Sequence, residues 1–122
     1  YNSNPLSLKT AIINFDKLQA LNSKKYLLLG DMLELGKHSK KLHQSIVPII
    51  NKTKINKVFV KGRHVLSIFN SISKSKRGRI FHHNSQIINL IKNDLKNNDY
   101  LMVKASNATG FNKIINYFRS VR

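Results

Sequence analysis

The chain has 122 residues, the size of one domain, and a formal net charge of +17 at pH 7. Hydrophobic residues make up 41% of the chain and cysteine is absent, so we expect a globular fold without disulfides, a thiol nucleophile or a cysteine-based metal site. No apolar run approaches the roughly 20 residues of a membrane span, and no signal-peptide pattern is present. These features fit a cytoplasmic location.

The positive charge has two interpretations. A strongly basic domain commonly binds nucleic acid. However, the excess is mostly lysine in a chain that is also rich in Asn and Ile, and all three residues have AT-rich codons, so we favour compositional drift of the genome. The densest basic run, residues 74–79, contains no aromatic residue for base stacking and is predicted to be a solvated loop. A small basic nucleic-acid-binding α/β module is the alternative function.

Helical spacing and short apolar runs alternate along the chain. In order, they predict a helix with apolar residues from Leu8 to Leu18, a strand at 25–29, a helix from Leu42 to Ile50, a strand at 57–60 closed by Gly62, a helix from Val65 to Ile72, a weaker strand at 79–82, a helix from Ile87 to Leu95, a strand at 100–103 and a helix from Phe111 to Val121. Asn4 is a natural cap for the first helix, and Pro48 should end or kink the second. This alternation predicts a single α/β domain with a mainly parallel sheet and helices on both faces.

The most informative stretch is the loop after the first predicted strand. The apolar run 27–29 ends at Gly30, and then Asp31 and Glu34 follow, two of only five acidic residues in the chain. In open parallel sheets, ligands bind outside the carboxyl ends of the strands. A carboxylate there could hold an ammonium group of a substrate. The alternative is that one acid only caps or salt-bridges the loop.

Lys104 and Ser106 occupy the equivalent place after the last predicted strand. The ammonium of Lys104 could pair with a carboxylate or with developing negative charge. Ser106 and the amides that follow could donate hydrogen bonds, because helix N-termini attract anions.

Other chemistry is absent from the sequence or weakly indicated. Neither a P-loop nor a Gly-x-Gly-x-x-Gly motif is present, so the chain alone should not hydrolyse ATP. His82 and His83 are adjacent on a predicted strand and should point to opposite faces, so we expect no metal site there. For His43 we expect a structural hydrogen bond.

Three segments resemble the C-terminal domain of the Mur ligases. Residues 30–36 read Gly-Asp-Met-Leu-Glu-Leu-Gly, residues 1–5 resemble the Tyr-Asn-Ala-Asn-Pro motif, and residues 103–106 resemble Val-Lys-Gly-Ser. Together, in this order, they extend the resemblance over essentially the whole chain. They are most similar to the branch that joins D-alanyl-D-alanine to UDP-N-acetylmuramoyl-tripeptide; the acidic loop distinguishes it from branches whose acceptor is an amino acid.

The resemblance implies that residues 1–122 form a Rossmann-like domain of a longer enzyme whose N-terminal and central ATP-binding domains are absent here. It implies an ATP-dependent ligation through an acyl phosphate in peptidoglycan precursor synthesis, with ATP and Mg²⁺ bound mainly by the central domain. This fragment alone should therefore be inactive, and no residue in it is assigned as catalytic. We expect small-molecule substrates, no specific nucleic acid, no membrane span and a monomer.

The resemblance also implies two groups of site residues. The first group matches the motif beside the ATP and is expected to bind the nucleotide: Tyr1, Asn2 and Asn4. The second group is expected to form the loops that border the acceptor substrate: Asp31, Glu34, Lys104, Ser106 and Asn107. Ala105 and Asn107 stand where the family has Gly and Arg. Since the loss of an Arg removes a bidentate carboxylate donor, the contacts to the acceptor should differ in detail.

Overall fold

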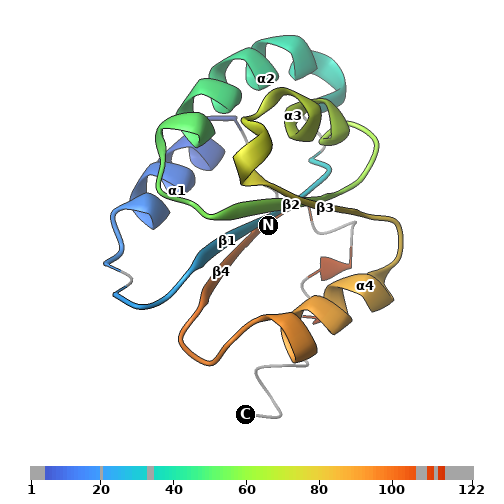
Figure 1. Ribbon diagram of the computed structural model, residues 1–122. Coiled ribbons are helices and arrows are strands. Elements are labelled where there is room, and N and C mark those ends of the chain that lie inside the picture. The colour runs from blue at the N-terminus through green and yellow to red at the C-terminus, as the bar shows by residue number, and fades with distance from the viewer. Residues whose placement is uncertain (1–4, 20, 33–34, 107–109, 112, 115–122) are drawn as a thin grey trace.

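The computed structural model describes residues 5–19, 21–32, 35–106, 110–111 and 113–114. Helices and strands alternate along this part of the chain (Figure 1). In order, the elements are α1 (Pro5–Asp16), β1 (Lys25–Gly30), α2 (Leu35–Lys52), β2 (Lys57–Lys61), α3 (Leu66–Ser71), a 3₁₀ turn η1 (Lys74–Lys76), β3 (Arg77–Phe81), α4 (Asn84–Asn89), a π-helical turn η2 (Leu90–Asp94) and β4 (Tyr100–Lys104).

The four strands form one parallel sheet in the order β3-β2-β1-β4. Parallel neighbours require crossover connections, and each connection here carries helical structure. β1 lies in the interior of the sheet, and its residues Leu27, Leu28 and Leu29 are fully buried, as expected of a strand covered on both faces. The predicted α/β fold with a parallel sheet is confirmed.

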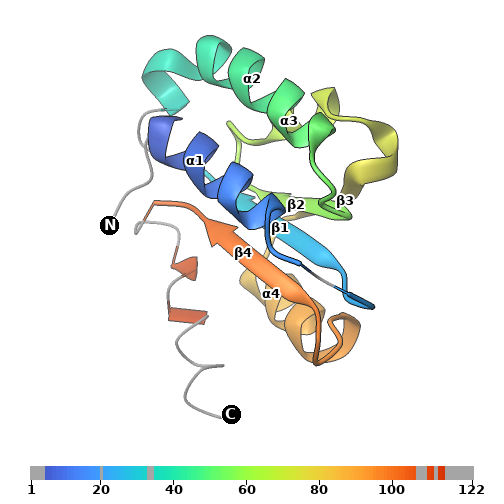
Figure 2. The ribbon, with the colours of Figure 1, turned by 90° about the vertical axis from the view of Figure 1, so that its left-hand side faces the viewer.

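Helices cover both faces of this sheet, as predicted. α1, α2 and α3 lie on one side, and α4 lies on the other (Figures 1 and 2). Leu27 and Leu29 face the first layer, whereas Leu28 faces the second. This alternation follows from the two-residue period of a strand, and it places two apolar clusters back to back. None of the described helices is long and apolar enough to cross a membrane.

α1 is shorter than the apolar spacing predicts. Leu8, Ile12 and Phe15 are buried against the sheet, but the helix ends at Asp16. Leu18 therefore lies beyond the helix with 46% of its surface exposed, and its predicted place on the buried stripe is wrong. Spacing alone did not reveal the end of the helix, because the apolar period continues past it.

Pro48 does not end the second helix. α2 continues to Lys52, four residues beyond the proline. Pro48 is exposed, and so is Gln44, whose carbonyl loses its helical partner because proline has no N–H group. Water can satisfy that carbonyl on the exposed side of the helix, so the chain tolerates the proline.

The basic run 74–79 is not merely a solvated loop. β3 begins within it, at Arg77, two residues earlier than predicted. Lys76 Nζ donates to the carbonyls of Thr53 and Ile55, 2.6 and 2.9 Å away. The Arg77 guanidinium likewise donates to backbone carbonyls of α3 and the residue after it. These contacts tie the run to its neighbours.

β3 also ends earlier than predicted, at Phe81. His82 and His83 therefore lie in the turn before α4 and not on a strand. Both of their backbone N–H groups donate to Gln86 Oε1, at 2.6 and 2.9 Å. This arrangement satisfies amides that have no partner in the strand or the helix.

The last two predicted helices differ from the apolar spacing. α4 ends at Asn89 and continues as the π-helical turn, so Leu95 lies outside the helix. Of the final helix, the described part comprises a few helical residues around the buried Phe111 and Ile114. The remainder of that prediction lies outside the described residues.

Candidate functional site

The carboxyl ends of three neighbouring strands meet at one edge of the sheet. In the strand pairing, Gly30 at the end of β1 lies beside Lys61 at the end of β2, and Leu29 lies beside Lys104 at the end of β4. We call the segments 31–32, 61–65 and 104–106 at these ends the rim. The sheet therefore brings Asp31, Lys104 and Ser106 to the same edge, as the sequence predicts.

Asp31 is the residue through which the rim segments contact one another. Its carboxylate accepts three backbone hydrogen bonds, from the N–H groups of Arg63 at 2.9 Å, His64 at 3.0 Å and Val65 at 3.1 Å. Its carbonyl oxygen accepts a fourth, from the N–H of Ser106 at 3.0 Å. Charge-assisted hydrogen bonds of this kind are among the stronger ones in proteins. The carboxylate therefore has a structural partner, which sequence analysis raised only as the alternative.

Sequence analysis did not single out the loop 62–65 as part of the site. The available signal was Gly62, which directly follows a predicted strand, next to a strand that is itself followed by an acid. Gly62 has a φ of +137°, a conformation that favours glycine. A glycine in such a place indicates a turn whose amides can face a neighbouring acceptor.

Two rim cations come from the ends of the strands on either side of β1. Lys104, the last residue of β4, is partly buried. Lys61, which sequence analysis did not select, ends β2 with its Nζ 5.9 Å from the centre of the Phe111 ring. Together with Arg63 they outnumber the single described acid of the rim, Asp31. An excess of cations attracts anionic substrates such as carboxylates and phosphates.

Ser106 lies deeper than a ligand-contacting side chain usually does. Only 5% of its surface is exposed, and its N–H already donates to Asp31. The predicted residues Tyr1, Asn2, Asn4, Glu34 and Asn107 lie outside the described residues, so the nucleotide contacts and part of the acceptor loop keep the status of predictions.

His43 makes the structural hydrogen bond that we expected. It lies on α2, and its Nδ1 is 2.6 Å from the hydroxyl oxygen of Ser67 on α3. That hydroxyl also donates to the carbonyl of His64, at 3.1 Å. Burial lowers the pKa of His43 below its usual 6.5, and the neighbouring His64 lowers it further. The pair fastens α2 to the helix that follows the rim loop.

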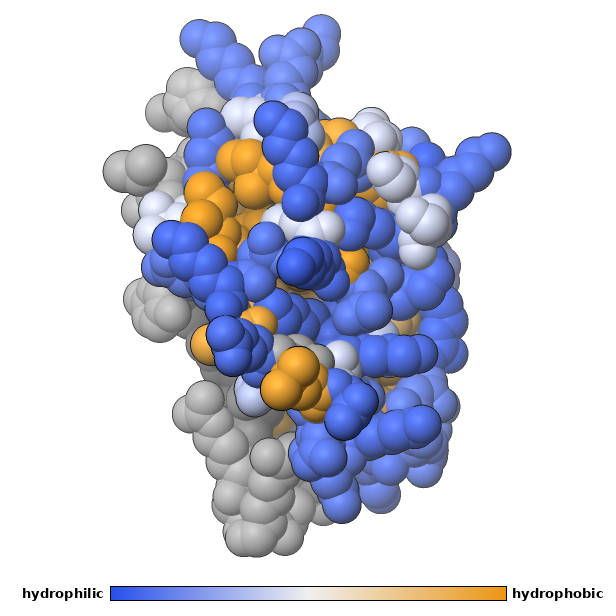
Figure 3. Space-filling model, turned by 60° about the vertical axis from the view of Figure 1, so that its left-hand side comes forward, coloured by the Kyte–Doolittle hydropathy of each residue, from blue (hydrophilic) through white to orange (hydrophobic). Residues whose placement is uncertain are grey.

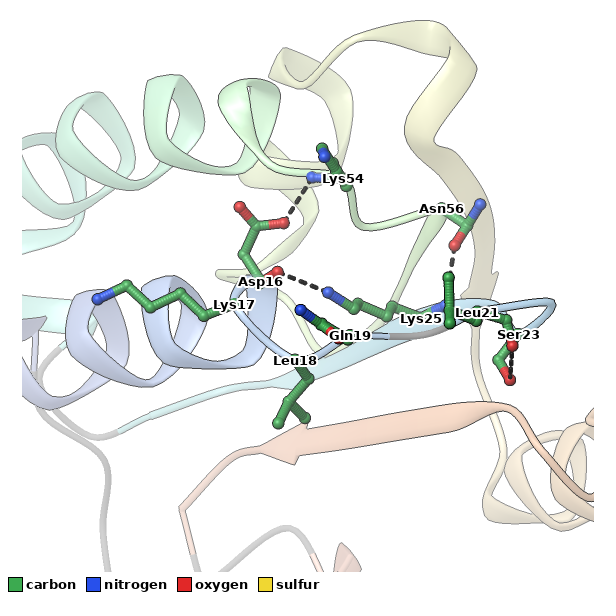
Figure 4. Close-up of a pocket in the computed structure, with 9 residues that line it drawn as sticks. All are labelled: Asp16, Lys17, Leu18, Gln19, Leu21, Ser23, Lys25, Lys54 and Asn56. Atoms are coloured by element: carbon green, nitrogen blue, oxygen red, sulfur yellow. Dashed lines mark hydrogen bonds between the residues drawn. The ribbon is translucent and has the colours of Figure 1, made fainter.

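A hollow lies at the opposite, amino edge of the sheet. It measures about 700 Å³, and Figure 4 shows the side chains around it. Its lining comprises Asp16, Lys17, Leu18, Gln19, Leu21, Ser23, Lys25, Lys54 and Asn56. The hydrogen bonds among the groups that line this hollow have structural roles, so we do not consider it the candidate functional site.

Lys25 is the buried charge in this hollow, with 5% of its surface exposed. Its ammonium donates to the carbonyl of Asp16 at the end of α1, where the helix dipole favours a cation (Figure 4). The Asp16 carboxylate accepts the N–H of Lys54 at 2.7 Å, and Asn56 Oδ1 accepts the N–H of Lys25 at 2.8 Å. These hydrogen bonds stabilise the end of α1 and hold the loops beside it in place.

One face of the molecule is largely hydrophilic. Figure 3 shows one face on which hydrophilic side chains predominate and hydrophobic ones form small groups. The large exposed hydrophobic side chains of the described chain include Leu21 and Ile13. Within the described ranges, no three His, Asp or Glu side chains are grouped so that they could hold a metal ion.

Comparison with known proteins identifies the family. A family model described as Mur ligase, glutamate ligase domain, matches residues 1–107. The UDP-N-acetylmuramoyl-tripeptide–D-alanyl-D-alanine ligase of Rickettsia prowazekii is 28% identical over 119 residues, which cover 98% of this chain and 26% of the relative. The enzyme of that name from Buchnera aphidicola subsp. Baizongia pistaciae is 35% identical over 117 residues, covering 94% and 24%. The chain thus spans about a quarter of the length of these relatives.

Solved structures agree on the fold. MurF ligase from Thermotoga maritima in complex with ADP aligns with a TM-score of 0.71 and 24% identity, covering 98% of this chain and 26% of that one. A MurF structure from Acinetobacter baumannii aligns with a TM-score of 0.73 and 17% identity, covering 94% and 25%. Because the family model matches residues 1–107, which is most of the chain, this chain belongs to the Mur ligase family.

Proposed function

We propose that this chain serves as the C-terminal domain of a ligase that joins D-alanyl-D-alanine to UDP-N-acetylmuramoyl-tripeptide. The observation that carries the proposal is the rim, where segments that resemble this branch lie at adjacent strand ends. The relatives that cover nearly the whole chain bear this ligase's name, which supports the same substrates. The nucleic-acid alternative finds no support among them.

The proposed reaction divides the work between this chain and the rest of the ligase. ATP with Mg²⁺, bound mainly by a central domain, would supply the activation of the tripeptide carboxylate as an acyl phosphate. The relative solved with ADP supports the use of a nucleotide. Since no phosphate-binding loop occurs in this sequence, the chain by itself should be inactive.

The contribution of this chain is to present the acceptor. Lys104 would pair its ammonium with the carboxylate of D-alanyl-D-alanine, while the dipeptide amine attacks the acyl-phosphate carbonyl, loses a proton and displaces phosphate as the amide bond forms. Asp31, Glu34, Ser106 and Asn107 would shape the loops around the acceptor. Holding the two reactants in place and excluding water would favour ligation over hydrolysis of the acyl phosphate.

Tyr1, Asn2 and Asn4 would contact the nucleotide from the start of the chain. Asn amides both donate and accept hydrogen bonds, so they suit ribose and phosphate oxygens. Asn4 could also cap α1, and the two roles are compatible. We further propose that the ligase acts on these small molecules in the cytoplasm, as a monomer.

The test is a kinetic assay of the full-length ligase that contains this chain. We expect it to form the ligated product from UDP-N-acetylmuramoyl-tripeptide, D-alanyl-D-alanine and ATP. Lys104→Met, which keeps the apolar stem, should raise the KM for the dipeptide by about tenfold or more, because one charge-assisted contact is lost. Lys96→Met at the amino edge is the matched control and should leave that KM unchanged.

Two results would count against the proposal. If the unaltered ligase forms no product with D-alanyl-D-alanine, the proposed substrate is wrong. If Lys104→Met leaves both the dipeptide KM and the turnover unchanged, Lys104 does not contact the acceptor.

A further inference from the structure

We propose that Asp31 and Gly62 form a clamp that positions the rim for the acceptor, and that Asp31 acts through this clamp and does not hold the acceptor amine. The inference rests on the proposed function for its catalytic consequence, but the clamp itself stands on the contacts of described residues. It changes the role expected of Asp31 and adds Gly62 to the residues on which the site depends.

Most hydrogen-bond acceptor positions of the Asp31 carboxylate are already occupied. An ionised carboxylate has about four places for hydrogen-bond donors. Three of them are taken by the N–H groups of Arg63, His64 and Val65. About one place remains, so a substrate ammonium could form a single hydrogen bond there and would gain a second only by displacing one of these N–H groups. Asp31 is therefore suited to hold the loop and poorly suited to hold an amine.

Gly62 leaves space for the Asp31 carboxylate. A Cβ atom built on Gly62 would lie 2.5 Å from Asp31 Cγ and 2.6 and 2.8 Å from its two oxygens. Side chains essentially never pack so closely. The φ of +137° adds strain for any residue other than glycine. The space and the conformation both require glycine at this position.

Asp31 also connects to the segment that follows the neighbouring strand β4. The Asp31 carbonyl oxygen accepts the N–H of Ser106, two residues after Lys104. One residue thus holds the segment after β2 with its side chain and the segment after β4 with its backbone. A shift of Asp31 would move the loop 62–65 and the chain beside Lys104 together.

Asp99 provides a matched control within the same chain. Its two carboxylate oxygens also accept backbone N–H groups, from Lys24 and Lys96, each at 3.0 Å. This contact joins two loops at the amino edge, away from the rim. Loss of either carboxylate should loosen loops, but only loss of Asp31 should disturb the rim.

The test compares Asp31→Ala, Asp31→Asn and Asp99→Ala in the full-length ligase. For Asp31→Ala we expect kcat/KM for D-alanyl-D-alanine to fall by about 10- to 100-fold, because small misplacements of a binding group have effects of this size. The KM for ATP should change much less. Asp99→Ala should lower the melting temperature but keep kcat/KM within about twofold of the original enzyme, since its loops lie at the other edge.

Asp31→Asn separates positioning from charge. Asn keeps an oxygen that can accept from His64 and Val65, so a clamp should survive in part and kcat/KM should lie well above that of Asp31→Ala. If the acceptor amine depends on the negative charge, Asn and Ala should be equally impaired, and the inference would be overturned. It would also be overturned if Asp99→Ala reduced kcat/KM as much as Asp31→Ala.

A second measurement judges the clamp without reference to activity. Hydrogen exchange of the Arg63, His64 and Val65 amides should accelerate by about tenfold or more in Asp31→Ala, as expected for loss of a local contact. The Ser106 amide, whose acceptor is the backbone carbonyl of residue 31, should accelerate less. The Lys24 and Lys96 amides should not change. Unchanged exchange at all four rim amides would refute the clamp, whereas a ligase that rejects D-alanyl-D-alanine would refute only the proposed function.

Discussion

Aspartate carboxylates bind backbone N–H groups at both edges of the sheet, but the cations beside them differ between the two edges. At both edges an aspartate carboxylate accepts backbone N–H groups of a distant loop: Asp31 at the carboxyl edge, and Asp16 and Asp99 at the amino edge. The amino edge has a hollow of about 700 Å³ and the more deeply buried cation, Lys25. That cation, however, is already bonded to the end of a helix.

The carboxyl edge differs because its cations lie at the ends of the two strands that flank β1. Lys61 and Lys104 come from β2 and β4, which flank β1, so their side chains start from neighbouring positions around Asp31. In a parallel sheet all strands end at the same edge, and loops from several of them can contact one ligand. Strand direction thus brings charged groups of several segments to the carboxyl edge, whereas the buried cation at the amino edge is bonded within the fold.

The largest effect on this comparison should come from Gly62→Ala. Both the positive φ and the collision with the Asp31 carboxylate oppose a side chain, so we expect the free energy of unfolding to fall by about 3 kcal/mol. Gly110→Ala is the matched control, because Gly110 also has a positive φ, +78°, but among the described residues an added Cβ would meet no atom closer than 3.9 Å. Its loss should be about 1 kcal/mol. Urea unfolding measures both, and equal losses would mean that the carboxylate does not occupy this space.

Lys25→Met should have an intermediate effect and tests the amino edge. The substitution keeps most of the buried stem but removes the ammonium that bonds to the Asp16 carbonyl. We expect a loss of about 1 kcal/mol, the size of a cation at a helix end in a partly buried place. Lys24→Met, whose side chain is exposed, is the control and should change stability little. If Lys25→Met also impaired ligation in the full-length enzyme, the division of roles between the edges would be wrong.

The smallest effect should be a pH dependence from His43 beside the rim. Its pKa is lower in the folded chain than the 6.5 of an unfolded one, so the unfolded chain takes up the proton first as the pH falls. The contribution of this histidine to stability is therefore complete above about pH 6.5 and is lost as the pH falls through that value. His43→Gln should make the decrease in melting temperature between pH 7.5 and 5.5 shallower. An unchanged slope in His43→Gln would contradict this prediction.

Local sequence patterns determined most of the fold. The apolar run 27–29 predicted a strand covered on both faces, and helices between strands predicted parallel pairing; both predictions are confirmed. These patterns work because burial repeats with the period of the element that forms it. They failed at boundaries such as Leu18 and Pro48, where the end of a helix depends on packing and solvent exposure, which the spacing of apolar residues does not record.

Part of the candidate site could likewise be predicted from the sequence, whereas the rest depended on the tertiary structure. The sequence by itself marked Asp31 and Lys104 as residues that follow strands, and this placed them at one edge. Only the tertiary structure decided that the Asp31 carboxylate is bonded to the amides of 63–65, more than thirty residues away. Every residue except proline carries such an amide, so the sequence holds no signal for this partner beyond the glycine that makes room for it.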